Sequence, residues 1–217
     1  MRPELDTILS INKVIAILRG VDADALLPVA QALVDGGIQM MEITYCQHNP
    51  ASFYDTAAQI EALRKRFAGK AYVGAGTVMT KEQVDLSAEA GAVFIISPDT
   101  NPQVISYTKK RGMVSIPGAM TPSEIMLAYN SGADYVKVFP AANLGPAYIK
   151  SIRGPLSHIP LMAVGGIDKN NVGAFLAAGV CGVGVGGTLL NKGAIAQGDY
   201  EKLTQAAQEL IAATNQI

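Results

Sequence analysis

The chain has 217 residues, of which 49% are hydrophobic and 16% charged, and its formal net charge at pH 7 is −1. This length allows one domain or two small ones, and we expect a single domain over residues 1–217. The near-neutral charge, without a basic cluster, predicts no nucleic acid and no membrane as a partner. The two cysteines, Cys46 and Cys181, exclude a disulfide framework and a four-ligand zinc site.

The N-terminal residues lack the apolar core of a signal peptide. No apolar run reaches the roughly 18 residues that a membrane-spanning helix needs. We therefore expect a cytoplasmic protein.

Strand-like and helix-like segments alternate along the chain. Eight strands are expected, at residues 13–19, 38–44, 71–76, 92–96, 113–116, 133–139, 161–164 and 180–185. Helices are expected at 22–34, 50–67, 80–90, 102–111, 146–152, 168–179 and 200–213, with a further helix beginning at 121. Predicted caps are Asp22, Thr80 (helped by Glu82), Asp168 and a capping box from Thr121 to Glu124.

The strands are mostly continuous apolar runs, which is typical of a parallel sheet covered by helices. Eight such strand–helix units predict an α/β fold, the single-domain (β/α)8 TIM barrel. An open doubly wound sheet is the alternative, although no G-x-G-x-x-G follows the first strand.

A lysine interrupts the strand at 133–139. Alternation places Tyr135, Lys137 and Phe139 on one face and Val136 and Val138 on the other. Burial lowers the pKa of a lysine from about 10.4 towards neutrality, and a neutral amine can form a Schiff base with a carbonyl. The alternative is that the Lys137 amine escapes to solvent at the strand end.

In a (β/α)8 barrel the functional site lies at the carboxyl ends of the strands. Polar residues and glycines collect there in this sequence, together with two prolines and a phenylalanine: Arg19, Glu42, Thr44, Thr77, Ser97, Pro98, Pro117, Gly118, Lys137, Phe139, Gly165, Gly166, Gly186, Gly187 and Thr188.

Two glycine pairs follow the last two strands, at 165–166 and 186–187. Glycine lets backbone N–H groups approach an anion, and these two loops form the usual phosphate site of the barrel. Thr188 can add a hydroxyl donor. The alternative is that the glycines only make tight turns.

Glu42 and Lys137 both point inwards at the same end of the predicted barrel. A carboxylate near a Schiff-base lysine can move the protons of the reaction, whereas the alternative is a buried structural ion pair. Arg19 can bind a carboxylate or phosphate, unless it is only a solvated strand end. The two histidines, His48 and His158, have no ligand-spaced partner, and we predict no metal and no other cofactor.

Seven segments together resemble one enzyme family. They are Ile-Ala-Ile-Leu-Arg-Gly (15–20), Met-Glu-Ile-Thr (41–44), Val-Gly-Ala-Gly-Thr-Val (73–78), Phe-Ile-Ile-Ser-Pro (94–98), Ile-Pro-Gly-Ala-Met-Thr-Pro-Ser-Glu (116–124), Val-Lys-Val-Phe-Pro-Ala (136–141) and Val-Gly-Gly-Ile (164–167). The sequence resembles the bacterial aldolases of 2-keto-3-deoxy-6-phosphogluconate (KDPG) and 4-hydroxy-2-oxoglutarate (KHG). The resemblance covers nearly the whole chain and keeps the order of the motifs.

The resemblance implies a class I aldolase assembled as a homotrimer of (β/α)8 barrels. The family's Schiff-base lysine falls on Lys137 and its acid/base glutamate on Glu42. The threonine that helps to hold the pyruvate carboxylate falls on Thr77, and the residues packed around the imine fall on Pro98 and Phe139. The phosphate loops fall on Gly165, Gly166, Gly186, Gly187 and Thr188.

The sequence departs from the family at residues 45–47, where better-known members carry an arginine that contacts the pyruvate carboxylate. Here the segment is Tyr45-Cys46-Gln47, and Arg19 is our candidate substitute. An arginine at this first strand resembles the branch that handles the galactonate epimer.

We expect reversible cleavage of KDPG into pyruvate and glyceraldehyde 3-phosphate. The same chemistry on the phosphogalactonate epimer or on 4-hydroxy-2-oxoglutarate is the alternative. More distant alternatives are a phosphosugar isomerase, a thiamin-phosphate-synthase-like transferase and a non-catalytic phosphosugar sensor.

Overall fold

The computed structural model describes residues 2–215, in which nine parallel strands form one sheet. The strands are β1 (Val14–Leu18), β2 (Met40–Thr44), β3 (Tyr72–Gly76), β4 (Phe94–Ile96), β5 (Val114–Ile116), β6 (Gly118–Ala119), β7 (Val136–Val138), β8 (Leu161–Val164) and β9 (Gly182–Val185). Their order in the sheet is β5-β4-β3-β2-β1-β9-β8-β7-β6.

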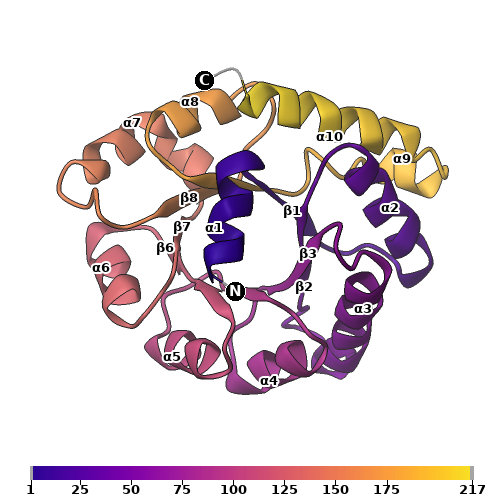
Figure 1. Ribbon diagram of the computed structural model, residues 1–217, viewed down its shortest axis with the longest axis horizontal. Coiled ribbons are helices and arrows are strands. Elements are labelled where there is room, and N and C mark those ends of the chain that lie inside the picture. Colours follow the sequence, from indigo (N-terminus) through magenta and orange to yellow (C-terminus); the bar gives the residue numbers. More distant parts are fainter. Residues whose placement is uncertain (1, 216–217) are drawn as a thin grey trace.

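The two ends of this order belong to one stretch of chain. The predicted fifth strand, at 113–116, corresponds to β5 and pairs with β4. After Pro117 the chain forms a further short strand, β6, which was not predicted and which pairs with β7. The sheet therefore curls into a nearly closed barrel, and Figure 1 shows the helices forming a ring around it. The predicted (β/α)8 barrel is confirmed, and the open doubly wound sheet is wrong.

The ring consists of α2 (Ala23–Asp35), α3 (Phe53–Arg66), α4 (Lys81–Glu89), α5 (Pro102–Lys110), α6 (Pro122–Asn130), α7 (Ala141–Arg153), α8 (Val172–Ala177), α9 (Lys192–Ala196) and α10 (Glu201–Thr214). A short 3-10 turn, η1 (Pro50–Ser52), precedes α3. None of the helices in the described part of the chain is long and apolar enough to span a membrane.

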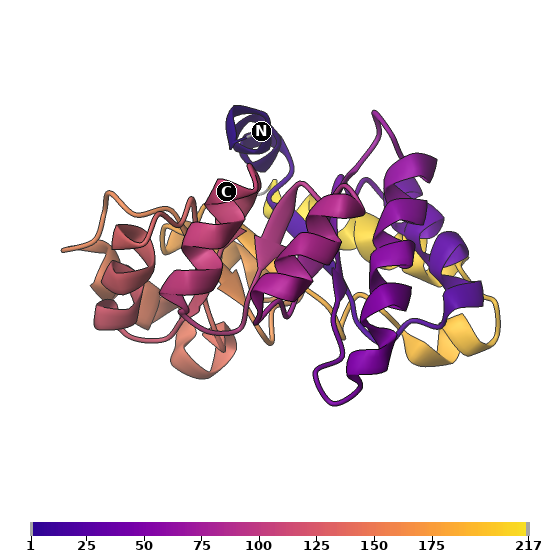
Figure 2. The ribbon, with the colours of Figure 1, turned by 90° about the horizontal axis from the view of Figure 1, so that it is seen from below.

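An additional helix, α1 (Arg2–Ile11), lies across the end of the barrel where the strands begin (Figures 1 and 2). The sequence pattern predicts no helix or strand at these residues. Leu5 and Leu9, one helical turn apart, are buried against the residues that fill the barrel. The helix therefore closes this end and leaves the opposite end, where the strands finish, for the site.

Side chains from alternate strand positions form two cores. Ile15, Met40, Phe94 and Tyr135 belong to the cluster inside the barrel, whereas Val136 packs in the cluster between the sheet and the helices. The alternation predicted for the lysine strand is confirmed, because Tyr135 and Val136 lie on opposite faces.

Several helix starts differ from the prediction. The box at Thr121 and Glu124 is confirmed, but the partner of Thr80 is Gln83 instead of Glu82. Asp22 occupies the N-cap position without a side-chain capping hydrogen bond.

Two helices have different bounds for local reasons. The carboxylate of Asp168 accepts from the backbone N–H groups of Asn170 and Asn171, which makes a turn that delays α8 to Val172. The helix predicted at Pro146 begins earlier, at Ala141, and is broken by Gly145, whose φ is 77°.

Candidate active site

Lys137 lies in the middle of β7 and points into the barrel. Its side chain is 6% exposed, and Nζ lies 4.7 Å from the centroid of the Phe139 ring. Burial lowers the pKa of the Lys137 amine, while the charge of Glu42 opposes this shift. The amine therefore does not extend into solvent, and its environment favours the neutral, nucleophilic form.

Glu42 lies in β2, on the opposite side of the barrel from β7. Three strands separate the two on one side of the ring, namely β1, β9 and β8. Glu42 is 2% exposed, and no described residue donates a hydrogen bond to its Oε2. Burial raises the pKa of Glu42 to about 7, against the opposing charges of Lys137 and Arg19. A carboxyl group with this pKa can both take and give a proton near neutral pH.

Arg19 follows β1 and reaches Thr77, which follows β3. Nη2 of Arg19 donates to Oγ1 of Thr77 over 3.0 Å. Thr77 has a φ of 57°, a left-handed conformation that is unusual for a β-branched residue and costs about 1–3 kcal/mol. The structure thus joins two of the predicted binding residues in one strained arrangement beside Glu42.

Pro98 begins a loop that packs closely against β6. The carbonyl oxygen of Pro98 would lie 2.3 Å from a Cβ atom at Gly118, so only glycine fits there. Thr100 Oγ1 donates to the Gly118 carbonyl over 2.6 Å, and Gly118 is the register partner of Lys137. The loop is therefore fixed beside the lysine.

The same loop places a second carboxylate near the lysine. Asp99 Oδ1 is buried and has no hydrogen-bond partner among the described residues. The charge of Asp99 raises the pKa of Lys137, which burial lowers more strongly. Asp99 was missed in the sequence, although it directly follows Ser97-Pro98 at a strand end.

Gly165 and Gly166 follow β8 and have positive φ angles of 96° and 72°. A Cβ at Gly165 would lie 3.2 Å from the Phe139 ring, and one at Gly166 would lie 2.5 Å from Cβ of Ala142. This pair brings the β8 loop against the start of α7, next to the residues that surround the lysine.

Gly186, Gly187 and Thr188 follow β9. Neither glycine adopts a positive φ, and a Cβ at Gly187 would meet nothing within 4 Å. Thr188 Oγ1 donates to the carbonyl of Ile167 over 2.9 Å, which ties the β9 loop to the β8 loop. In this arrangement the Thr188 hydroxyl proton is already used.

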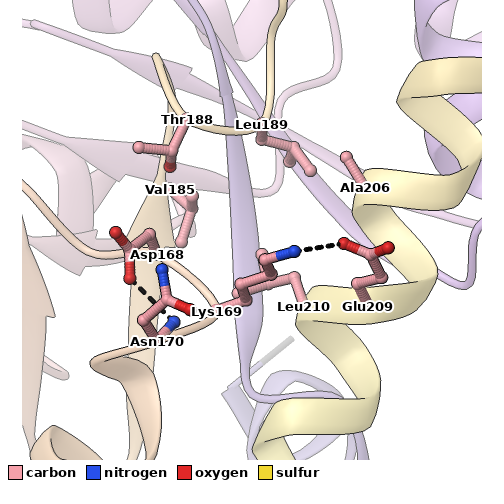
Figure 3. A pocket seen from close by; sticks show the side chains of 9 residues that line it. All are labelled: Asp168, Lys169, Asn170, Val185, Thr188, Leu189, Ala206, Glu209 and Leu210. Carbon is pink, nitrogen blue, oxygen red and sulfur yellow. Dashed lines mark hydrogen bonds and ion pairs between the residues drawn. The ribbon is translucent and has the colours of Figure 1, made fainter.

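A pocket of about 310 Å³ lies behind these loops, against α10 (Figure 3). Thr188 lines it together with Asp168, and Lys169 crosses it to pair with Glu209 at 2.7 Å. A second pocket, of about 380 Å³, lies beside α1. Lys137 and Glu42 line neither pocket, so neither marks the reacting groups.

Both histidines have exposed side chains. His48 is exposed beside Cys46, and the ring of the exposed His158 stands edge-on to Tyr129. Residues 2–215 contain no cluster of three or more His, Cys, Asp or Glu that could hold a metal ion.

Comparison with known proteins gives a consistent result. The family model described as KDPG and KHG aldolase matches residues 5–206. The chain is 36% identical over 180 residues to the 2-dehydro-3-deoxy-6-phosphogalactonate aldolase of Escherichia coli, which covers 82% of this chain and 85% of that one. It is 34% identical over 188 residues to the 2-dehydro-3-deoxy-phosphogluconate aldolase of Treponema pallidum, with 85% of each chain covered.

A solved structure shares the fold closely. It is the KDPG aldolase of Legionella pneumophila with pyruvate captured as a covalent carbinolamine, and its TM-score is 0.84 at 28% identity. The match covers 95% of this chain and 97% of that one.

Proposed function

The chain belongs to the family of KDPG and KHG aldolases, which are aldehyde-lyases, and on this premise we propose that it is a class I aldolase of a 2-keto-3-deoxy-6-phospho sugar acid. Membership of this family removes the isomerase, transferase and sensor alternatives. The observation that carries the proposal is the buried Lys137 facing the buried Glu42 across one barrel.

In the proposed mechanism the neutral Lys137 amine attacks the C2 ketone of the substrate and forms a carbinolamine. Glu42 supplies the proton with which hydroxide leaves as water, and a protonated imine forms. Glu42 then takes the proton of the C4 hydroxyl while the C3–C4 bond breaks. The electron pair of the C3–C4 bond passes into the protonated imine and gives an enamine. The aldehyde leaves, and Glu42 returns to C3 of the enamine the proton that it took from the C4 hydroxyl. Water then adds to the resulting pyruvate imine and releases pyruvate, with Lys137 restored as the amine.

The unpartnered Oε2 of Glu42 supports this role. A carboxylate that served only as a structural ion pair would be expected to have its buried oxygens satisfied, because an unsatisfied buried oxygen is costly. In the proposal, substrate hydroxyls or water supply the missing hydrogen bonds during the reaction.

The remaining predicted residues hold the two ends of the substrate. Arg19 and Thr77 bind the carboxylate, and Pro98 and Phe139 pack around the imine. Gly165, Gly166, Gly186, Gly187 and Thr188 form the phosphate site through their backbone N–H groups, because the Thr188 hydroxyl donates to the Ile167 carbonyl. Binding energy at the phosphate, far from the reacting bond, then orients the substrate. All these residues belong to one domain, proposed to span residues 1–217, and the chemistry requires no metal or organic cofactor.

We favour the phosphogalactonate epimer as the preferred substrate. Residues 45–47 carry no arginine, Arg19 contacts Thr77 instead, and the relative from Escherichia coli is a phosphogalactonate aldolase. The gluconate epimer, the substrate expected first from the sequence, is the second candidate, supported by the relative from Treponema pallidum.

The decisive assay measures pyruvate release from both epimers and from 4-hydroxy-2-oxoglutarate, with Lys137→Met as control. We expect the highest kcat/KM on the galactonate epimer and loss of activity on all three in Lys137→Met. A higher kcat/KM on the gluconate epimer would reverse the substrate assignment, and an active Lys137→Met would refute the mechanism.

A homotrimer in the cytoplasm completes the proposal. The trimer follows from the family resemblance, and the cytoplasm is the location expected from the sequence. Light scattering coupled to size-exclusion chromatography tests the assembly: a mass near three times 22.7 kDa supports it, and a monomer contradicts it.

A further inference from the structure

Gln47 lies in the loop after β2, within the segment that lacks the family's arginine. Its Nε2 donates to the backbone carbonyl of Thr77 over 2.5 Å. Its Oε1 accepts from Nε2 of Gln83, in α4, over 3.1 Å. Gln47 therefore connects Thr77, which Arg19 also contacts, to a helix of the outer ring.

The Gln83 end of this series of hydrogen bonds is held firmly in place. Gln83 is 0% exposed, and its Oε1 accepts from the backbone N–H groups of Met79 at 2.7 Å and Thr80 at 3.2 Å. The backbone N–H of Gln83 in turn donates to Oγ1 of Thr80, which completes the capping box of α4. The Gln83 side chain cannot move without breaking the start of the helix.

The groups at the two ends of the series Thr77–Gln47–Gln83 determine the direction of each hydrogen bond within it. Backbone N–H groups can only donate, so Oε1 of Gln83 must face Met79 and Thr80, and Nε2 must face Gln47. The Thr77 carbonyl can only accept, so Nε2 of Gln47 must face it. A glutamate at position 47 would place an acceptor against that carbonyl and break the chain.

This series of hydrogen bonds ends on Thr77, the one non-glycine residue among those described that has a positive φ. A threonine leaves the left-handed region readily unless its surroundings hold it there. The hydrogen bond from Gln47 to the Thr77 carbonyl and the bond from Arg19 to the Thr77 hydroxyl hold the residue at both of its polar ends.

We propose that Gln47 is a positioning residue for recognition of the substrate carboxylate, because it fixes the Thr77 backbone and so presents the Thr77 hydroxyl and Arg19 together. This inference rests on the proposed function, in which Arg19 and Thr77 bind that carboxylate. Gln47 touches neither the reacting atoms nor the substrate. Where the family's arginine contacts the pyruvate carboxylate directly, Gln47 instead fixes the position of Thr77.

The test uses the full chain in the condensation direction, with pyruvate and glyceraldehyde 3-phosphate varied separately. Gln47→Ala should raise the KM for pyruvate about 3- to 10-fold, since one hydrogen bond is lost. The kcat and the KM for the aldehyde should change less than about twofold, because this binding energy acts on ground state and transition state alike. Gln47→Glu should raise the KM for pyruvate further.

Gln208→Ala, an exposed glutamine on α10, is the matched control and should leave all three constants unchanged. The melting temperature of each variant separates positioning from folding, and we expect it to stay at the wild-type value. An unchanged KM for pyruvate in both Gln47 variants overturns the inference. The inference is also overturned if the KM values for both substrates rise equally and the melting temperature falls.

Trapping the wild-type protein with pyruvate and borohydride distinguishes the two levels of failure. If the wild type forms an adduct and the Gln47 variants bind pyruvate normally, the inference alone fails. If the wild type forms no adduct, the proposed function fails and the inference fails with it.

Discussion

Gly76 and the Glu42 carboxyl group are in such close contact that no side chain fits between them. A Cβ atom at position 76 would lie 2.6 Å from Cδ of Glu42 and 2.7 Å from each of its oxygens. Gly76 ends β3, in register with Thr44 of β2, so its backbone forms the wall against which the carboxyl group rests. The Glu42 carboxyl group can therefore occupy its position only because Gly76 in β3 has no Cβ atom.

Gly76→Ala should displace the Glu42 carboxyl group and lower kcat by about 100-fold, which is typical of a misplacement near 1 Å. The fold should persist, because the atoms that must move are at the end of a flexible side chain. Steady-state kinetics and thermal unfolding check both points. Gly154→Ala, whose Cβ would meet only the Ser151 carbonyl at 3.4 Å, serves as control. A wild-type kcat in Gly76→Ala would contradict the proposed position of Glu42.

The pKa of Glu42 predicts an unusual dependence of stability on pH. Because the pKa rises from 4.5 to about 7 on folding, the folded state binds this proton more tightly than the unfolded state. The contribution of Glu42 is therefore fully present below about pH 4.5 and is lost as the pH rises through 7. The loss amounts to about 3 kcal/mol at most.

Glu42→Gln removes this titration. Urea unfolding at pH 5 and pH 8 should show that the variant gains stability relative to the wild type as the pH rises. The pH profile of wild-type activity should also change near pH 7, and the variant should lose kcat by at least about 100-fold. A difference in unfolding free energy that does not depend on pH would show that Glu42 has an ordinary pKa.

Asp99 offers a test of the charge around Lys137. Its charge raises the pKa of Lys137, so Asp99→Asn should lower that pKa further and make the neutral amine available at lower pH. The rate of imine trapping by pyruvate and borohydride, measured against pH, should reach half its maximum at a lower pH than in the wild type. Asp24→Asn, in the exposed first turn of α2, should not shift the profile. An upward shift in Asp99→Asn would refute the interaction.

Gly187 is a sharp probe of the proposed phosphate site, since nothing in the fold requires glycine there. Its φ is not positive, and a Cβ would meet nothing within 4 Å. Gly187→Ala should therefore keep the melting temperature but raise the KM for the phosphorylated substrate about tenfold, as expected if the methyl group obstructs the anion. Pyruvate trapping should be unaffected. If the KM does not change, the phosphate lies elsewhere.

The sequence predicted the barrel well because its strands are continuous apolar runs separated by helix caps and glycines. It did not predict α1, since within residues 4–11 of that helix only Leu5 and Leu9 are buried. It also did not predict β6, because this two-residue strand after Pro117 is defined only by its pairing with β7.

The inward-pointing pair Glu42 and Lys137 could be found from strand alternation alone. The supporting residues could not, because they act through contacts between distant segments. The role of Gln47 depends on its contact with Thr77, 30 residues away, and the role of Gly76 depends on its contact with Glu42. Asp99 could have been found by extending the same reading of strand ends by one residue.

The covalent chemistry of Lys137 is the most direct test of the proposed mechanism. The protein is incubated with pyruvate and borohydride, and its intact mass is compared with that of Lys137→Met and Lys137→Arg treated alike. We predict one pyruvate-derived adduct on the wild type, located at Lys137, and none on either variant. An unmodified wild type, or an adduct that persists in Lys137→Met, would contradict the assignment of Lys137 as the Schiff-base lysine.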